Sequence, residues 1–145
     1  MKKLFVAEAN ADNWEQSLKT AADILLENHC VKKDFYESCV KRENEFPTGL
    51  TPECPVAIPH TDKDHVLENG ICVLRLCKPV LFRRMDDPDK TVPVDFVINM
   101  ALLEDEEHLV MIKKVIKSIQ DVGYINKLKS MSLEEMKQSL LEHLF

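Results

Sequence analysis

The middle of the chain reads Val56-Ala57-Ile58-Pro59-His60-Thr61-Asp62, a short apolar run that stops at a proline and a histidine. The apolar residues predict a buried strand, and Pro59 fixes the backbone where that strand ends. Open α/β sheets tend to bind ligands at the ends of their strands. An imidazole titrates near neutral pH and is nucleophilic when neutral. His60 is therefore a candidate for chemistry at a strand end, although a histidine after a turn can also be an ordinary loop residue.

The segment just before this strand supplies groups that suit a phosphate. It reads Arg42-Glu43-Asn44-Glu45-Phe46-Pro47-Thr48-Gly49-Leu50. The guanidinium of Arg42 and the hydroxyl of Thr48 match the oxygens of a phosphoryl group. The proline and glycine of this segment favour a turn between a helix and the strand that follows.

The rest of the chain indicates alternating helices and strands. Strands are expected at 4–7, 55–58, 71–77, 78–84 and 92–102, and helices at 14–26, 35–42, 104 to about 123, and 132–144. Residues 71–77 are apolar except for Arg75, and 92–102 are interrupted by Asp95 and Asn99, as in strands covered on both faces. We predict one α/β domain over residues 1–145, with a mixed β-sheet flanked by helices on both faces.

Polar pairs predict where the first two helices begin. Asp12 with Glu15, or Asn13 with Gln16, has the spacing of a capping box, and so has Asp34 with Glu37. In such a box the side chains satisfy the first free amides of the helix. The first helix should therefore begin near residue 13, and the second should begin after Asp34.

Composition restricts the functional classes. The 145 residues suit one domain, and a hydrophobic content of 45% is enough for a sizeable core. No apolar run approaches the roughly 18 residues of a membrane-spanning helix. A net charge of −6 argues against nucleic acid and suits a basic protein partner. Five cysteines without a CxxC pair favour a reduced compartment. We therefore expect a cytoplasmic protein without membrane insertion.

With these motifs in place, the chain resembles a known family. The Val-Ala-Ile-Pro-His run, preceded by Arg42 and the Thr48-Gly49 pair, is similar to the active-site signature of the mannitol/fructose-type IIA components of sugar phosphotransferase systems. The combination of residues 46–50 with 56–62 looks closest to the galactitol-specific branch. The sequence departs from the commoner Thr-Gly-Ile/Val-Gly form at Leu50 and Thr51. The resemblance spans nearly the whole chain.

The resemblance implies a phosphotransferase that needs no cofactor or metal. His60 would be the phosphorylated residue, with Arg42 against the phosphoryl oxygens. His108 matches a second histidine at a helix start, and could hydrogen-bond the phosphoryl group or orient His60. Phospho-HPr would be the donor, and a IIB cysteine that serves a membrane IIC transporter the acceptor, for a hexitol such as galactitol. A regulatory IIA-like protein, whose phosphorylation state controls partner binding, is the alternative.

Each supporting residue also has a plainer interpretation. Arg42 could be a solvated arginine at a helix end, His108 a polar residue at an acidic helix start, and Thr48 a residue that only shapes the turn. Glu43 or Asp62 could fix the tautomer of a histidine.

The sequence disfavours two other kinds of site, a metal site and a Cys–His hydrolase. A metal site from Cys54, His60, His65 and His108 fits no standard zinc spacing. A Cys–His hydrolase would use Cys54, whose neighbours Glu53 and Pro55 offer no support for a thiolate.

Overall fold

The computed structural model describes residues 3–103 and 106–144, and the description leaves out the side chains of 106–108. The strands of this part of the chain form one five-stranded sheet, in the order β1-β4-β5-β3-β2. Neighbours β1/β4 and β3/β5 are parallel, whereas β4/β5 and β2/β3 are antiparallel. The strands are β1 (Lys3–Ala9), β2 (Gly49–Thr51), β3 (Cys54–Ala57), β4 (Gly70–Arg83) and β5 (Thr91–Ala101). The sheet is mixed, as predicted.

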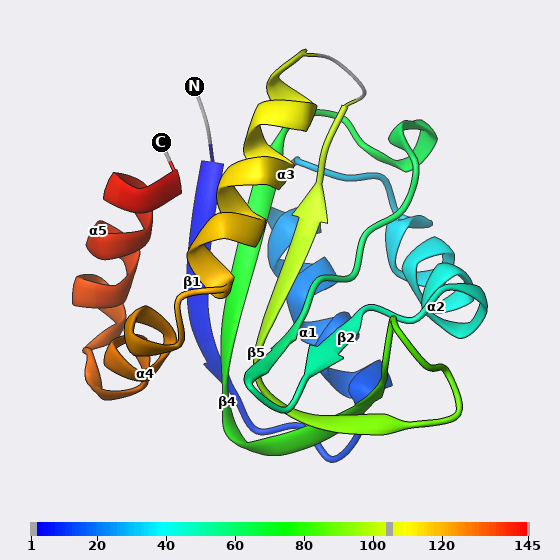
Figure 1. Cartoon of the computed structure of the whole chain (residues 1–145). Helices are drawn as coiled ribbons and strands as arrows, with labels where there is room; N and C mark the ends of the chain where they lie inside the picture. Colours follow the sequence, from blue (N-terminus) through cyan, green and yellow to red (C-terminus); the bar gives the residue numbers. More distant parts are fainter. Residues whose placement is uncertain (1–2, 104–105, 145) are drawn as a thin grey trace.

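Helices cover both faces of this sheet (Figure 1). One face packs against the first two helices, and the other against the last three. The helices are α1 (Trp14–Glu27), α2 (Phe35–Glu45), α3 (Glu106–Ile119), α4 (Val122–Ser130) and α5 (Leu133–Leu144), and a short 3-10 helix, η1 (Lys63–His65), follows β3. The predicted α/β class, with helices on both faces, is confirmed.

The central strands divide the core into two apolar layers. On β4, Cys72 and Leu74 pack into the layer under α1 and α2, whereas Ile71 and Val73 pack into the layer under α3, α4 and α5. Alternate side chains of a strand point to opposite faces, so one strand supplies both layers. This explains why residues 71–77 are apolar almost throughout.

Arg75 interrupts that apolar run because it binds the end of a helix. Its Nη1 donates to the carbonyl oxygens of Leu128, at 3.0 Å, and Met131, at 2.5 Å. Its guanidinium also pairs with Glu8 on the neighbouring strand. The last carbonyls of a helix have no partner within the helix. Arg75 therefore supplies donors to the C-terminal end of α4.

The helix starts agree with the capping predictions in one case and correct them in another. Asn13 accepts a hydrogen bond from the Gln16 backbone N–H at 2.9 Å, which confirms the start of α1. Asp34 makes no capping hydrogen bond from its side chain. Its carboxylate instead lies 2.9 Å from Nδ1 of His65. The predicted cap is wrong because this pairing occupies the carboxylate.

Other element boundaries also differ from the predictions. The strands expected at 71–77 and 78–84 are one strand, β4, whose pairing with β5 shifts register between Arg75 and Val80. The helix expected to reach about residue 123 ends at Ile119. Asp121 then accepts from the Tyr124 backbone N–H at 3.1 Å and starts α4. Asp121 caps a new helix only two residues after α3 ends. The apolar pattern of the sequence does not show this break, so the sequence predicted one helix.

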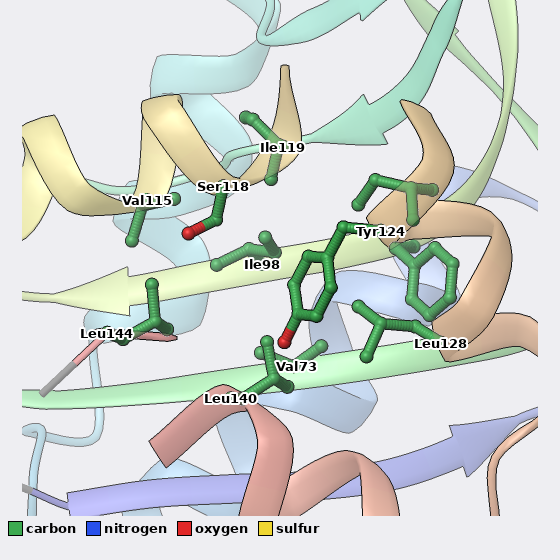
Figure 2. A pocket seen from close by; sticks show the side chains of 11 residues that line it. Val73, Ile98, Val115, Ser118, Ile119, Tyr124, Leu128, Leu140 and Leu144 are labelled. Atoms are coloured by element: carbon green, nitrogen blue, oxygen red, sulfur yellow. The ribbon is translucent and has the colours of Figure 1, made fainter. Parts of the chain in front are cut away.

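A small apolar cavity of about 10 Å³ remains between α3, α4, α5 and the sheet. Figure 2 shows the apolar side chains around it, among them Ile98 from β5 and Leu140 from α5. Space of this size is at the lower limit for a water molecule, and a water needs polar partners. The cavity is therefore a packing gap between side chains and not a binding site.

Candidate active site

His60 lies at the edge of the sheet where two parallel strands end. It follows β3 after Ile58 and Pro59, and it forms an isolated parallel bridge with Met100, near the end of β5. Because β3 and β5 are parallel, their carboxyl ends meet at this edge. The first turn of α3 begins a few residues after β5 and contains His108. The His108 side chain lies outside the described residues, so its predicted approach to His60 stays a prediction.

The His60 ring is half-buried and oriented by the backbone carbonyl of Ile58. Its Nδ1 lies 2.9 Å from the carbonyl oxygen of Ile58. A carbonyl oxygen only accepts hydrogen bonds, so Nδ1 carries the proton in this contact. In the neutral ring, the lone pair is then on Nε2. This is the tautomer that makes Nε2 the nucleophilic nitrogen.

Arg42 is exposed on α2, with its guanidinium carbon 5.4 Å from the centre of the Phe46 ring. It lines an open cleft of about 430 Å³. Thr61 and Asp62, the two residues after His60, line the same cleft. The fold thus places the predicted phosphate-binding cation beside the segment that carries His60.

Thr48 is buried between α2 and the segment that leads to His60. Its hydroxyl donates to Oε1 of Glu43 at 2.8 Å, and its backbone N–H donates to Oε2 at 2.7 Å. The same hydroxyl accepts the backbone N–H of Ile58 at 3.2 Å. These contacts are made within the protein, and the phosphate contact suggested for Thr48 stays a prediction.

Glu43 is a carboxylate held inside the protein, with 4% of its surface exposed. Burial raises its pKa above the usual range, and the two donors of Thr48 and the nearby Arg83 guanidinium oppose that shift. A buried carboxylate is expensive unless it is hydrogen-bonded. Thr48 therefore supplies the partners that let Glu43 remain buried.

Asn99 is a site residue that the sequence did not assign, although it interrupts the apolar run of β5. It is fully buried, and its Nδ2 donates to the carbonyl oxygen of Pro59 at 3.0 Å. The Met100 backbone N–H reaches the same oxygen at 3.1 Å. A polar residue at a buried strand position was the only signal, and it does not indicate a partner in another segment.

Several polar side chains of this region lie close to one another. The Ser38 and Thr61 hydroxyls are 2.5 Å apart. His65 lies within 2.9 Å of an Asp34 oxygen and 3.6 Å of an Asp62 oxygen. Of the two residues suggested for fixing a histidine tautomer, Asp62 faces His65. Glu43 is connected to His60 indirectly: it binds Thr48, Thr48 binds the Ile58 N–H, and the Ile58 carbonyl oxygen contacts the His60 ring.

The described residues give no support to the disfavoured alternatives. No group of three or more histidine, cysteine or acidic residues among them could hold a metal. The Cys54 thiol donates to the carbonyl oxygen of Ile119 at 2.7 Å, and burial raises its pKa. Burial also raises the pKa values of Cys39 and Cys72 to about 12, whereas Cys77 is exposed. The thiols of Cys39 and Cys72 are therefore not suited to act as thiolates.

Searches against known proteins agree on one family. A family model described as "Phosphoenolpyruvate-dependent sugar phosphotransferase system, EIIA 2" matches residues 1–143. The ascorbate-specific PTS system EIIA component of Escherichia coli K12 is 25% identical over 137 residues, which cover 93% of this chain and 86% of that protein.

None of the described helices is long and apolar enough to cross a bilayer.

Solved structures share the fold. The complex of enzyme IIAMTL with phosphorylated enzyme IIBMTL from Escherichia coli contains a chain that matches with a TM-score of 0.79 and 22% identity, covering 98% of this chain and 99% of that one. The nitrogen regulatory protein IIA-Ntr from Neisseria meningitidis matches with a TM-score of 0.73 and 23% identity, covering 94% and 92%. The match over residues 1–143 shows that the chain belongs to the type-2 EIIA family of the sugar phosphotransferase system, whose members are phosphotransferases.

Proposed function

We propose that His60 is the phosphoryl acceptor of this EIIA protein and that Nε2 is the phosphorylated nitrogen. The observation that supports this most directly is the 2.9 Å contact between Nδ1 and the Ile58 carbonyl oxygen. It keeps the proton on Nδ1 and the lone pair on Nε2. It also orients the ring before a donor arrives, and such positioning can supply a large part of the rate of a transfer reaction.

The transfer needs no group other than the two proteins. As the Nε2 lone pair forms the new N–P bond, the N–P bond to the phosphohistidine of HPr breaks, and its electron pair returns to that imidazole. The His60 ring gains positive charge, which the Ile58 carbonyl oxygen stabilises through Nδ1–H. In the second step a cysteine thiolate of a IIB protein takes the phosphoryl group, and the N–P electron pair returns to Nε2.

Arg42 and His108 would assist at the phosphoryl group. Arg42 is exposed and lines the cleft beside Thr61, so its guanidinium can meet equatorial phosphoryl oxygens. His108, in the first turn of α3, would hydrogen-bond the phosphoryl group or orient His60. The phosphate contact suggested for Thr48 would require its hydroxyl to leave Glu43.

The partner classes are those of the family: HPr as donor, and a IIB component as acceptor for a membrane IIC transporter. The substrate is less direct, because an EIIA protein hands phosphate to IIB and need not touch the sugar. The predicted galactitol specificity gains no support from the curated relatives, whose names specify ascorbate. We therefore propose the IIB protein of an ascorbate-type system as the acceptor. The predicted cytoplasmic location stays a prediction.

The regulatory alternative shares the same first step. IIA-Ntr has this fold, so the architecture does not separate a transport relay from a phosphorylation-dependent regulator. The two differ in the second step, because only the relay requires rapid delivery of phosphate to a IIB cysteine.

One reconstitution tests these proposals together. Purified protein is incubated with phospho-HPr, and acid-labile phosphate on His60 is measured by mass spectrometry. His60→Ala should abolish incorporation, while His143→Ala, a histidine on α5, should not change it. Full labelling of His60→Ala would exclude this acceptor. Adding IIB proteins of ascorbate, galactitol and mannitol systems then identifies the acceptor cysteine; labelled protein that discharges to none of them would favour the regulator.

A further inference from the structure

Two backbone groups shortly before His60, the Ile58 N–H and the Pro59 carbonyl, are held by buried side chains from other parts of the fold. Thr48 binds the Ile58 N–H from the segment after α2, and Asn99 binds the Pro59 carbonyl from β5. Glu43 in turn binds Thr48 through both of its donors. We refer to Glu43, Thr48 and Asn99 as the backbone clamp.

The clamp acts where the regular strand pairing ends. Regular pairing of β3 with β5 ends at Ala57 and Val97. Pro59 has no N–H to give to a ladder. Beyond Ala57 the Met100 N–H still bonds the Pro59 carbonyl oxygen at 3.1 Å, and the clamp side chains add hydrogen bonds to this segment just before the histidine.

Ile58 connects the clamp to the imidazole through its two backbone groups. Its N–H donates to Thr48 at 3.2 Å, and its carbonyl oxygen, in the next peptide group, receives Nδ1 of His60 at 2.9 Å. The Thr48 hydroxyl donates its hydrogen bond to Glu43, so its oxygen lone pairs are available to accept the Ile58 N–H. A rotation of the backbone at Ile58 would move the carbonyl away from Nδ1.

Stability alone explains this arrangement poorly. Burial of the Glu43 carboxylate is unfavourable, and so is burial of Asn99, whose Oδ1 has no hydrogen-bond partner among the described residues. Replacement of such groups by apolar side chains of similar size is often neutral or stabilising. Both unfavourable groups converge on the residues next to His60, which favours a role in the reaction.

We propose that Glu43, Thr48 and Asn99 are positioning residues, which hold the backbone before His60 so that Nδ1–H stays on the Ile58 carbonyl and Nε2 remains the nucleophile. This inference rests on the proposed function for its kinetic consequence. Its structural consequence, the tautomer of the resting His60 ring, can be measured without any phosphoryl transfer.

Substitutions of similar size separate positioning from folding. Thr48→Val removes the hydroxyl, Thr48→Ser keeps it, Glu43→Gln removes the charge, and Asn99→Val removes the amide. We expect Asn99→Val to melt no lower than the wild type. Thr48→Val, Glu43→Gln and Asn99→Val should each lower the maximal rate of His60 phosphorylation by about tenfold or more with little change in the KM for phospho-HPr. Thr48→Ser should retain most of the rate, and Thr20→Val, on α1, serves as the control.

The ¹⁵N NMR shifts of the His60 ring give the second measurement. In the wild type, Nδ1 should have the shift of a protonated nitrogen and Nε2 that of an unprotonated one. Thr48→Val and Glu43→Gln should show a mixture of tautomers, and Thr48→Ser the wild-type pattern. Folded variants with wild-type shifts and rates would overturn the clamp. If wild-type His60 takes up no phosphate, the proposed function fails, while the ring shifts still decide whether the clamp sets the tautomer. If Thr48→Val does not fold, Asn99→Val and its rate decide the same question.

Discussion

At the residue scale, Arg42 and Glu43 are adjacent on α2 but have opposite environments. Arg42 is exposed and lines the cleft beside Thr61, whereas Glu43 is buried and bonded to Thr48. Consecutive helical residues point about 100° apart. One helix end can therefore offer a cation to an approaching phosphoryl group and a carboxylate to the backbone behind His60.

Removal of the Arg42 charge should slow transfer without unfolding the protein. Arg42→Ala leaves no buried group unpaired, so the free energy of unfolding should change by no more than about 1 kcal/mol, including the contact with Phe46. The rate of phosphate transfer from HPr should fall by about 10²-fold or more, because developing charge on the oxygens loses its partner.

Rapid-quench kinetics and thermal melts measure both effects. Lys33→Ala removes one exposed positive charge just before α2 and should leave the rate near that of the wild type. A similar loss of rate in both variants would indicate general steering of an acidic protein and not a contact with the phosphoryl group.

At the element scale, the sequence predicted strands and long helices well because their apolar periodicity is local. It also indicated His60 and Arg42, because these residues lie in a short recognisable motif. It could not predict that Asn99 meets Pro59, since that contact depends on the pairing of two strands 40 residues apart. Nor could it predict that Asp34 would pair with His65, since the same carboxylate fits a helix cap equally well in sequence.

Arg75 gives an element-scale prediction about the end of α4. Arg75→Met keeps the aliphatic part of the side chain but removes the donors to Leu128 and Met131. The loss of charge-assisted hydrogen bonds should lower the free energy of unfolding by about 1.5–3 kcal/mol. Urea denaturation measures it.

Lys78→Met is the matched control, because it removes a cation of the same strand whose partner, Asp12, is exposed. An exposed ion pair contributes at most about 1 kcal/mol. Equal losses in the free energy of unfolding would show that the contact of Arg75 with the helix end stabilises the protein no more than an exposed ion pair does.

At the scale of the whole molecule, β4 and β5 belong to both apolar layers, so neither layer can lose its packing alone. We expect one cooperative unfolding transition, with equal calorimetric and van't Hoff enthalpies. Leu25→Ala in one layer and Leu128→Ala in the other should each lower the melting temperature of that single transition, at a loss of about 2–5 kcal/mol. Two separate transitions in differential scanning calorimetry, each sensitive to one substitution, would contradict a shared centre.

The uneven exposure of the cysteines makes this protein easy to label at one position. Cys77 is the exposed thiol, whereas Cys30, Cys39 and Cys72 are buried and Cys54 is half-buried with a raised pKa. A maleimide dye should therefore attach first at Cys77. Strand β4 begins at the end of the sheet where His60 lies. Cys77 lies seven residues after Gly70, the first residue of β4, which corresponds to about 23 Å along the strand. The natural chain can thus carry a fluorophore far from the reacting imidazole, and partner docking can be followed by anisotropy without engineering a new attachment point.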